Sequence, residues 1–295
     1  MSSNRRVELL LLGTVVVWAM NFTVVKFSLR VMDPMSFNSF RFFLAVGSMY
    51  LIWWKSGQSL VVRKGDWPRL IGLGVLGHLL YQLLFILGLN WTYAANGAVM
   101  LGTTPVWVAL ATRLLLRQPL RWSSWIGILV AVTGVWLIME GSESGLTLEV
   151  TTIKGDLTVL LAAIVFGLFT FLSRPMLGRY TPIQLTTLVM FIGGPMVVLA
   201  GIPWILQTDF AGITWEAWVG VFYSGILSIA VAFMLWNSGI RQVGAVRTST
   251  FQNLVPVLGL LFGVVLLSES LLPLQYVGAG LTVVGIILAR RTPAV

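Results

Sequence analysis

The sequence predicts an all-α, polytopic membrane protein with ten transmembrane helices arranged as two inverted five-helix repeats. Three observations lead to this fold class. Of the 295 residues, 57% are hydrophobic and only 10% are charged, whereas roughly a quarter are charged in soluble domains. Long apolar stretches follow one another along the whole chain, and the chain aligns with itself at a fixed offset. The stretches leave no room for a sizeable soluble catalytic domain.

Ten apolar stretches, bounded by charged residues, Pro or Gly, approach the length of about 20 residues that a bilayer requires. They are residues 7–28, 36–54, 67–89, 91–114, 122–140, 155–173, 182–206, 215–239, 241–267 and 271–290. The third and fourth are barely separated, as are the eighth and ninth, so the placement of charges has to decide the count.

Charge placement favours ten spans. With a cytoplasmic N-terminus, 15 of the 19 Lys and Arg residues fall in inner segments, and eight of the ten acids fall in outer ones, as the positive-inside rule requires. The run after Arg5 and Arg6 is too long for a signal peptide. We therefore expect a plasma (inner) membrane protein with both termini cytoplasmic, in contact with the lipid bilayer.

The remaining composition excludes several functions. The net charge of +9 is scattered between apolar runs, so it reflects topology rather than nucleic-acid binding. The absence of cysteine excludes thiolate sites, and the single histidine, His78, excludes a multi-histidine metal site. We expect no metal, no cofactor and no catalytic residues.

The two halves of the chain are related by sequence. An offset of 151 residues aligns 88–137 with 239–288 and gives 12 identities in 50 positions, and an offset of 148 pairs Lys26 with Arg174. Each half holds five spans, an odd number, so the second half enters the membrane in the opposite sense. Inverted repeats are typical of secondary transporters. The expected boundaries are a first repeat at 1–140, an outer linker at 141–154 and a second repeat at 155–295.

Two groups of residues carry a resemblance to a known family. The first half contains WAMNFTVVK and then a Pro and an Arg-Phe pair, which are Trp18, Asn21, Phe22, Lys26, Pro34, Arg41 and Phe42. The second half contains a Pro, a Gly-rich helix, a Glu and paired glycines, which are Pro256, Gly259, Gly263, Glu269, Gly278 and Gly285. Over essentially its whole length the chain resembles EamA-type members of the drug/metabolite transporter superfamily. It departs from internal symmetry at Gln118, where the second half has Glu269.

The resemblance implies ten helices, alternating access and transport of a small metabolite. It places the first, third, fourth, sixth, eighth and ninth helices around a central cavity. Our prediction is a secondary carrier for an amino acid-like or similar solute, with export preferred and no enzymatic activity. A membrane scaffold or a channel is the alternative, and an intramembrane hydrolase that uses Ser224 and His78 is a weaker one.

Charged residues within spans point to a binding site. Lys26 shares one helix face with Trp18 and Phe22, and Arg41 lies about five residues inside the second span. Such charges are costly in a bilayer and usually face a cavity. They predict a cationic vestibule for a carboxylate or phosphate. The alternative is that both side chains snorkel to headgroups or pair with Asp33 or Glu269.

Polar residues at mid-depth extend the candidate substrate site. His78, Tyr81 and Gln82 share a face of the third span, where they either line a cavity or pack internally. His78 is the only midplane group that titrates near neutrality, so we expect facilitated diffusion, exchange or coupling through His78. An aromatic and amide lining is expected from Trp18, Asn21, Phe166, Trp236 and Asn237.

Pro105 and Pro256 break the fourth and ninth spans at equivalent places and free the carbonyls of Leu101 and Gln252. Polar residues near interrupted helices indicate a transporter site. Those that we assign to the substrate site are Asn96, Thr103, Gln252 and Asn253. The alternative is a structural bend whose carbonyls are bonded by Ser or Thr.

Glycines recur every seven residues on the fifth and tenth spans, at Gly127, Gly134, Gly278 and Gly285. Small residues let two helices approach closely. They predict helix packing either within the chain or across a homodimer.

Overall fold

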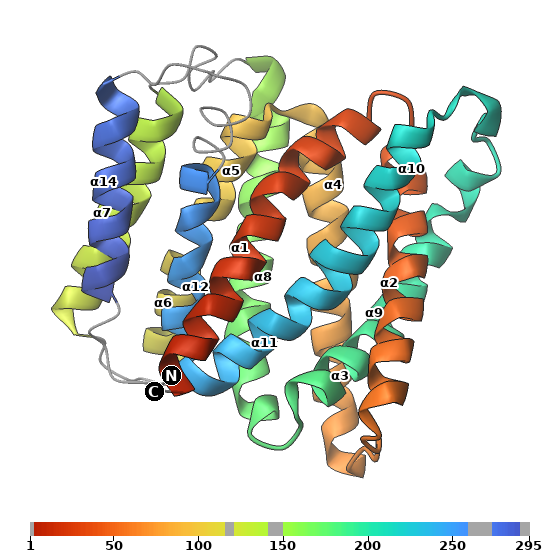
Figure 1. Ribbon diagram of the computed structural model, residues 1–295, viewed down its shortest axis with the longest axis horizontal. Coiled ribbons are helices and arrows are strands. Elements are labelled where there is room, and N and C mark those ends of the chain that lie inside the picture. The colour runs from red at the N-terminus through yellow and green to blue at the C-terminus, as the bar shows by residue number, and fades with distance from the viewer. Residues whose placement is uncertain (1–2, 116–120, 141–149, 259–272, 290–295) are drawn as a thin grey trace.

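The computed structural model describes residues 3–115, 121–140, 150–258 and 273–289. These residues form helices and short turns with no strand among them (Figure 1). The segments of the first half are α1 (Ser3–Ser28), α2 (Pro34–Ser56), η1 (Lys64–Asp66), α3 (Trp67–Gly74), η2 (Val75–Leu80), α4 (Tyr81–Trp91), α5 (Ala94–Gly102), α6 (Thr104–Leu115) and α7 (Trp122–Glu140). Those of the second half are α8 (Val150–Leu177), α9 (Pro182–Ile205), η3 (Phe210–Gly212), α10 (Trp215–Phe222), η4 (Tyr223–Val231), α11 (Ala232–Val243), α12 (Ala245–Thr250), η5 (Phe251–Asn253) and α14 (Pro273–Ala289).

Six helical stretches in this part of the chain are long and apolar enough to cross a membrane. They are Arg5–Ser28, Lys64–Trp91, Asn96–Leu115, Ile153–Leu177, Pro182–Ile205 and Trp215–Val243. Two further apolar helices, Trp122–Ile138 and Pro273–Leu288, are shorter. The all-helical, polytopic architecture is confirmed. The count of ten spans stays a prediction, since six stretches have the full length and part of the ninth span lies outside the described residues. Gln118 and Glu269 also lie outside them.

The second helix of each half begins in the same way. Asp33 accepts hydrogen bonds from the backbone N–H groups of Met35 and Ser36 at 2.7 and 3.2 Å, and Pro34 follows it. At the equivalent position Thr181 forms a capping box with Gln184, again followed by a proline. A capped helix start with Pro at its first position satisfies the free N–H groups there. The offset of 148 residues therefore relates the two starts in structure as well as in sequence.

The halves pack against each other along their whole length. Helix α1 packs on α10, η4 and α11 of the second half, and α8 packs on η2 and α4 of the first. Helix α2 pairs with α9, and α7 with α14. Figure 1 shows α1 rising from the lower end of the bundle, whereas α8 descends from the upper end. This exchange of partners is what an inverted duplication produces.

The third span of each half contains a π-helical stretch, six residues long in η2 and nine in η4. The fourth and ninth spans are broken. α5 ends at Gly102 and α6 begins at Thr104, just before Pro105, while α12 is followed by the 3₁₀ turn η5 and a helical stretch at 254–258 that contains Pro256. Such irregular backbone is tolerated at membrane depth where it is buried or lines a cavity.

The recurrent glycines pack α7 against α14 within the chain. A Cβ atom on Gly278 would lie 2.6 Å from the carbonyl oxygen of Gly134 and 2.7 Å from the backbone nitrogen of Ile138. A Cβ atom on Gly134 would lie 2.5 Å from the backbone nitrogen of Thr282. The opposing atoms belong mostly to the backbone, so they cannot move aside as a flexible side chain could.

We predict that Gly278→Ala lowers the stability of the protein by about 1–3 kcal/mol, because the added methyl group overpacks a backbone contact. Thermal unfolding of the purified protein in detergent measures this. Gly280→Ala is the matched control, since a Cβ atom on Gly280 meets nothing within 4 Å. Equal melting temperatures for the two variants would show that the close contact is unimportant.

Candidate functional site

A cavity with an empty volume of about 510 Å³ lies between the halves. Its lining comes from α1, α2, α4, α5, η4, α11, η5 and the helical stretch at 254–258. Six of the residues that the sequence assigns to the substrate site line it, namely Trp18, Asn21, Arg41, Tyr81, Gln82 and Gln252.

Arg41 is buried at the wall of this cavity, with 1% of its surface exposed. Its guanidinium donates from Nε to Asn38 Oδ1 at 2.9 Å, from Nη1 to Ser224 Oγ at 3.0 Å and from Nη2 to Gln82 Oε1 at 2.5 Å. All three partners are neutral, and no acid of the described chain forms an ion pair with it. Arg41 therefore neither snorkels nor pairs with Asp33, which caps α2 instead.

Two aromatic rings also face this cation. The guanidinium carbon of Arg41 lies 5.4 Å from the ring centre of Phe37 and 5.8 Å from that of Phe85. Contacts of this kind stabilise a cation modestly. They leave its full positive charge beside the cavity, and three hydrogen bonds leave further N–H groups of the five-donor fork for another partner.

Two amides of the cavity present unused acceptors. The side-chain oxygens of Asn21 and Gln252 are buried and have no hydrogen-bond partner among the described residues, although both residues line the cavity. A buried acceptor without a donor costs about 1–3 kcal/mol. The cavity thus combines a cation with acceptors that a donor group of a ligand can satisfy.

An aromatic cluster forms one wall. The ring centre of Trp18 lies 5.8 Å from that of Phe166, 6.0 Å from that of Phe233 and 5.0 Å from that of Trp236. Trp18 Nε1 donates to the carbonyl of Ser228 at 3.0 Å, within the π-helical stretch η4. This hydrogen bond joins the midpoint of α1 to the irregular part of the eighth span.

The other predicted residues lie outside the cavity lining. His78 is 1% exposed and packs against the rings of Phe42, Phe169 and Phe233. Trp236 donates to Thr170 Oγ1 at 3.1 Å and is fully buried behind Trp18.

The residues near the helix breaks are also internal. Thr103 bonds the carbonyl of Met100 at 2.6 Å, and Thr104 bonds the freed carbonyl of Leu101 at 2.7 Å. The first break is therefore a bend whose carbonyl a threonine satisfies. Asn253 is fully buried, and both polar atoms of its side chain lack partners.

Lys26 belongs to a polar cluster with Thr92, Asn96 and Asp156, close to the C-terminal ends of α1 and α4 and the start of α8. Figure 1 shows these helix ends at the upper end of the bundle. Lys26 Nζ donates to the carbonyl of Thr92 at 2.5 Å, at the C-terminal end of α4. Thr92 Oγ1 donates to Asp156 at 2.5 Å, and Asn96 Nδ2 donates to the same carboxylate at 3.1 and 3.2 Å. We call these four residues the upper cluster.

A lower cluster mirrors it at the opposite end. Arg174 Nη1 donates to the carbonyls of Ile240 and Arg241 at 2.5 and 2.9 Å, in the last turn of α11. Arg247, at the start of α12, pairs with Glu8 near the start of α1 at 2.6 Å. Lys26 and Arg174 are 148 residues apart, as are Glu8 and Asp156, and Asn96 is 151 residues from Arg247. The two clusters are thus related by the inverted repeat.

Several of these residues were missed from the sequence. Asp156 is one of the eight acids that the charge pattern assigns to the outer side. In the structure it is 5% exposed and accepts hydrogen bonds from Thr92 and Asn96 in the upper cluster. Asn38 lies three residues before Arg41 on the same helix, so its role could have been found from helical spacing. Ser224 is 183 residues from Arg41, and no local pattern indicates that pairing.

The geometry does not assemble a serine–histidine pair in the described residues. Ser224 accepts its hydrogen bond from Arg41, and Nδ1 of His78 has no partner. No cluster of three or more His, Asp or Glu side chains that could bind a metal occurs there either.

Comparisons with known proteins agree with this architecture. A solved crystal structure that is 18% identical superposes with a TM-score of 0.79 over 97% of this chain and 96% of that chain, which shows a shared fold. The uncharacterized transporter YyaM of Bacillus subtilis is 27% identical over 96% of this chain and 93% of its own length. An uncharacterized transporter of Archaeoglobus fulgidus is 26% identical over 94% and 96%.

A further relative carries a more specific name. A protein of Streptantibioticus cattleyicolor named as a probable terminal-alkyne amino-acid exporter is 27% identical over 94% of this chain and 91% of its own length. Residues 5–140 and 153–291 each match the family model described as the EamA-like transporter family. The chain belongs to the EamA-like transporter family.

Proposed function

We propose that this protein is a secondary carrier that moves an amino acid or a similar small carboxylate-bearing metabolite across the plasma membrane by alternating access, in the direction of export. Both termini are cytoplasmic in this proposal. The observation that carries it is Arg41, a buried guanidinium at the wall of a cavity, whose hydrogen-bond partners in the described part of the chain are all neutral.

A buried charge without a counter-ion is costly. A ligand carboxylate beside Arg41 reduces that cost, because a guanidinium and a carboxylate form two parallel hydrogen bonds. The ligand therefore supplies the negative charge that the described chain does not.

The second recognition element is the pair of amide oxygens on Asn21 and Gln252. Each accepts from a donor such as an ammonium group, and the rings of Trp18 and Phe22 on the same cavity wall favour a cation. A small molecule that carries both a carboxylate for Arg41 and an ammonium group for Asn21 and Gln252 is an amino acid. The name of the Streptantibioticus cattleyicolor relative, an amino-acid exporter, agrees with this substrate class.

Alternating access is assigned to the upper and lower clusters. Trp18 lies ten residues after Glu8 and eight before Lys26, about 15 and 12 Å along α1 at 1.5 Å per residue. The cavity therefore sits between the two clusters. In each cluster a cation at the end of the first helix of a repeat, Lys26 or Arg174, donates to carbonyls at the C-terminal end of the third span of the same repeat. The negative end of the helix dipole favours a cation there. The lower cluster faces the cytoplasm in this proposal, and either cluster opens while the other holds.

In this carrier, His78 does not couple transport to proton movement. Its ring is surrounded by Phe42, Phe169 and Phe233 and does not line the cavity. Facilitated transport or exchange is the proposed mode.

The first test measures substrate recognition in proteoliposomes by counterflow. We expect exchange of amino acids, and at least about a tenfold loss for the same amino acids with an amidated carboxyl group, because a charge-assisted hydrogen bond contributes about 1.5–3 kcal/mol. Arg41→Gln should abolish the preference, while Arg113→Gln, a change at an exposed cation of α6, should keep it.

The comparison between acid and amide uses the unaltered protein, so it does not depend on the folding of a variant. Equal counterflow of both forms would overturn the role of Arg41. Flux without exchange would indicate a channel, and no flux with any solute would indicate a scaffold.

The second test uses the natural absence of cysteine. Ser228→Cys places one thiol at the cavity wall, and a membrane-impermeant maleimide applied from either face of vesicles reports access. We expect Lys26→Gln to raise labelling from the outer face and Arg174→Gln to raise it from the inner face. Each increase should be about tenfold, because each variant loses a charge-assisted hydrogen bond that holds its end closed.

Arg30→Gln serves as control, since Arg30 is an exposed cation close to the end of α1. Increased labelling from the same face in both cluster variants, or in neither, would refute the assignment of the clusters as gates. This result is independent of which solute is carried.

A further inference from the structure

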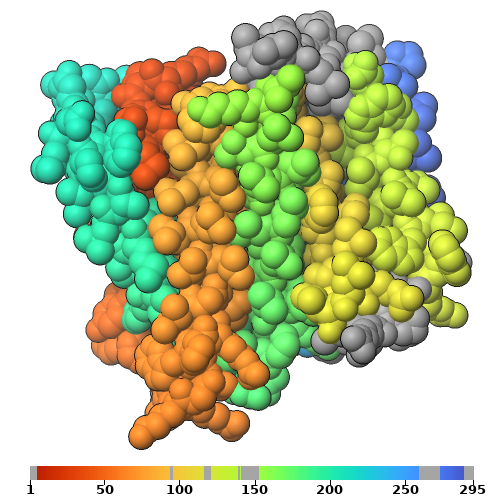
Figure 2. Space-filling model, turned by 180° about the vertical axis from the view of Figure 1, so that it is seen from behind, coloured from red at the N-terminus to blue at the C-terminus, as the bar shows by residue number. Residues whose placement is uncertain are grey.

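A second cavity lies on the outside of the bundle, in a groove between the lower parts of α3 and α8. Figure 2 shows these two helix ends side by side. The empty volume is about 850 Å³. Its floor and walls are mostly apolar, formed by Leu73, Leu76, Leu172, Pro175 and Met176.

Gly72 widens the groove at its α3 side. A Cβ atom on Gly72 would meet nothing within 4 Å, so the space next to it is open. The groove runs from Arg69 in α3 to Leu76 in η2 on one side, and from Leu172 in α8 to Arg179 in the turn after α8 on the other. At 1.5 Å per residue each side is about 10 Å long, enough to hold part of a hydrocarbon chain.

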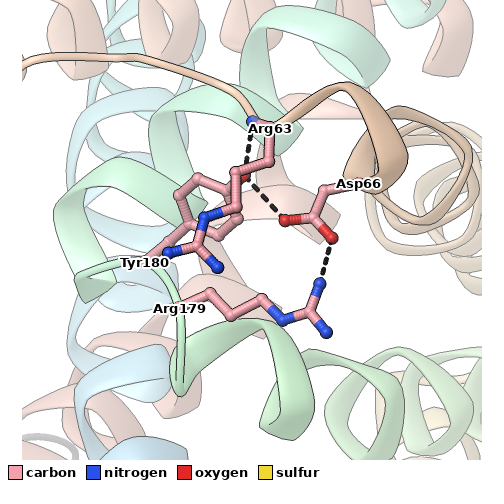
Figure 3. A network of polar contacts seen from close by, with 4 residues as sticks. All are labelled: Arg63, Asp66, Arg179 and Tyr180. Atoms are coloured by element: carbon pink, nitrogen blue, oxygen red, sulfur yellow. Dashed lines mark hydrogen bonds and ion pairs between the residues drawn. The ribbon is translucent and has the colours of Figure 1, made fainter.

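Two arginines, Arg69 and Arg179, close one end of the groove. Arg179 is held by Asp66, which is 1% exposed and also accepts a hydrogen bond from the hydroxyl of Tyr180 at 3.0 Å (Figure 3). That hydroxyl accepts from the backbone N–H of Arg63 at 3.2 Å. Tyr180 thus orients the carboxylate of Asp66, and this carboxylate pairs with the guanidinium of Arg179 at this end of the groove.

The charge at this end is unbalanced. Arg63, Lys64 and Arg69 are neighbours of Asp66 in the sequence, Arg179 pairs with it, and Arg69 takes part in none of the ion pairs of the described chain. Trp67, at the start of α3, is 45% exposed, as expected for an aromatic residue at the membrane–water interface. The two arginines therefore lie at headgroup level, with the apolar groove extending from them toward the bilayer core.

We propose that this groove binds one anionic phospholipid, with the phosphate between Arg69 and Arg179 and one acyl chain along α3 and α8. Basic pockets between transmembrane helices select anionic headgroups. A zwitterionic phospholipid fits the site less well, because its ammonium group meets the surplus of positive charge. The groove connects α3 of the first repeat to α8 of the second, so the lipid contacts both halves.

Native mass spectrometry of the purified, delipidated full chain tests the proposal. Phosphatidylglycerol and phosphatidylcholine with identical acyl chains are the probes, and inorganic phosphate is a third. We expect one phosphatidylglycerol molecule to be retained preferentially, and Arg69→Gln and Arg179→Gln each to reduce its retention about fivefold. Gly72→Leu, which extends a side chain into the open groove, should reduce retention of long-chain lipid without removing a charge.

Arg113→Gln removes an exposed cation at the end of α6 and should leave retention unchanged. Retention that falls equally in this control, or that is equal for the two phospholipids, would overturn the site as a specific one. Binding of inorganic phosphate with the same affinity as the lipid would also overturn it, since the acyl chain would then contribute nothing. Retention by Arg69→Gln and Arg179→Gln at the unaltered level, with helical content preserved, would refute the role of the two arginines.

Discussion

A helix bundle in a bilayer has to satisfy its polar groups internally, because the hydrocarbon core offers no hydrogen bonds. This constraint explains most of the polar contacts in the described chain. Trp18 and Trp236 each donate their indole N–H to a partner inside the bundle, and Thr104 bonds a carbonyl that Pro105 frees. Among the described residues, some buried polar atoms remain without a hydrogen-bond partner, and two of them, the amide oxygens of Asn21 and Gln252, belong to the lining of the central cavity. Arg41 lies at the same cavity and forms no ion pair within the described chain, so these groups are available to a ligand.

The same constraint accounts for the two ends of the bundle. Helix ends expose carbonyls that no intrahelical donor reaches, and a cation from a neighbouring helix bonds them in both clusters. Because the repeat is inverted, one arrangement appears once at each end. In the proposed carrier, one kind of closure is therefore used twice, once at each end of the bundle.

Much of the fold followed from the sequence, since apolar run length, charge alternation and internal repetition are local or periodic signals. The same holds for the residues that share a helix face, such as Tyr81 and Gln82, both of which line the cavity. The sequence could not show where long side chains end. The Lys26 side chain reaches from α1 to the end of α4, whereas Arg41, on the next helix, points inward among neutral partners. The surroundings of His78 and Asp156 could not be predicted either. His78 packs against aromatic rings and Asp156 bonds an amide, and most of these neighbours are far away in sequence.

The two π-helical stretches also record how the halves diverged. The stretches η2 and η4 begin 148 residues apart and end 151 residues apart, which are the two offsets that relate the repeats before and after them. The extra three residues of the second half therefore lie inside a transmembrane helix and not in a loop. In a regular α-helix three residues would rotate everything that follows by about 300°, and the wider winding of a π-helix accommodates them instead. The length difference at this depth is thus absorbed within the helix, and the segments before and after it keep their equivalence between the two halves.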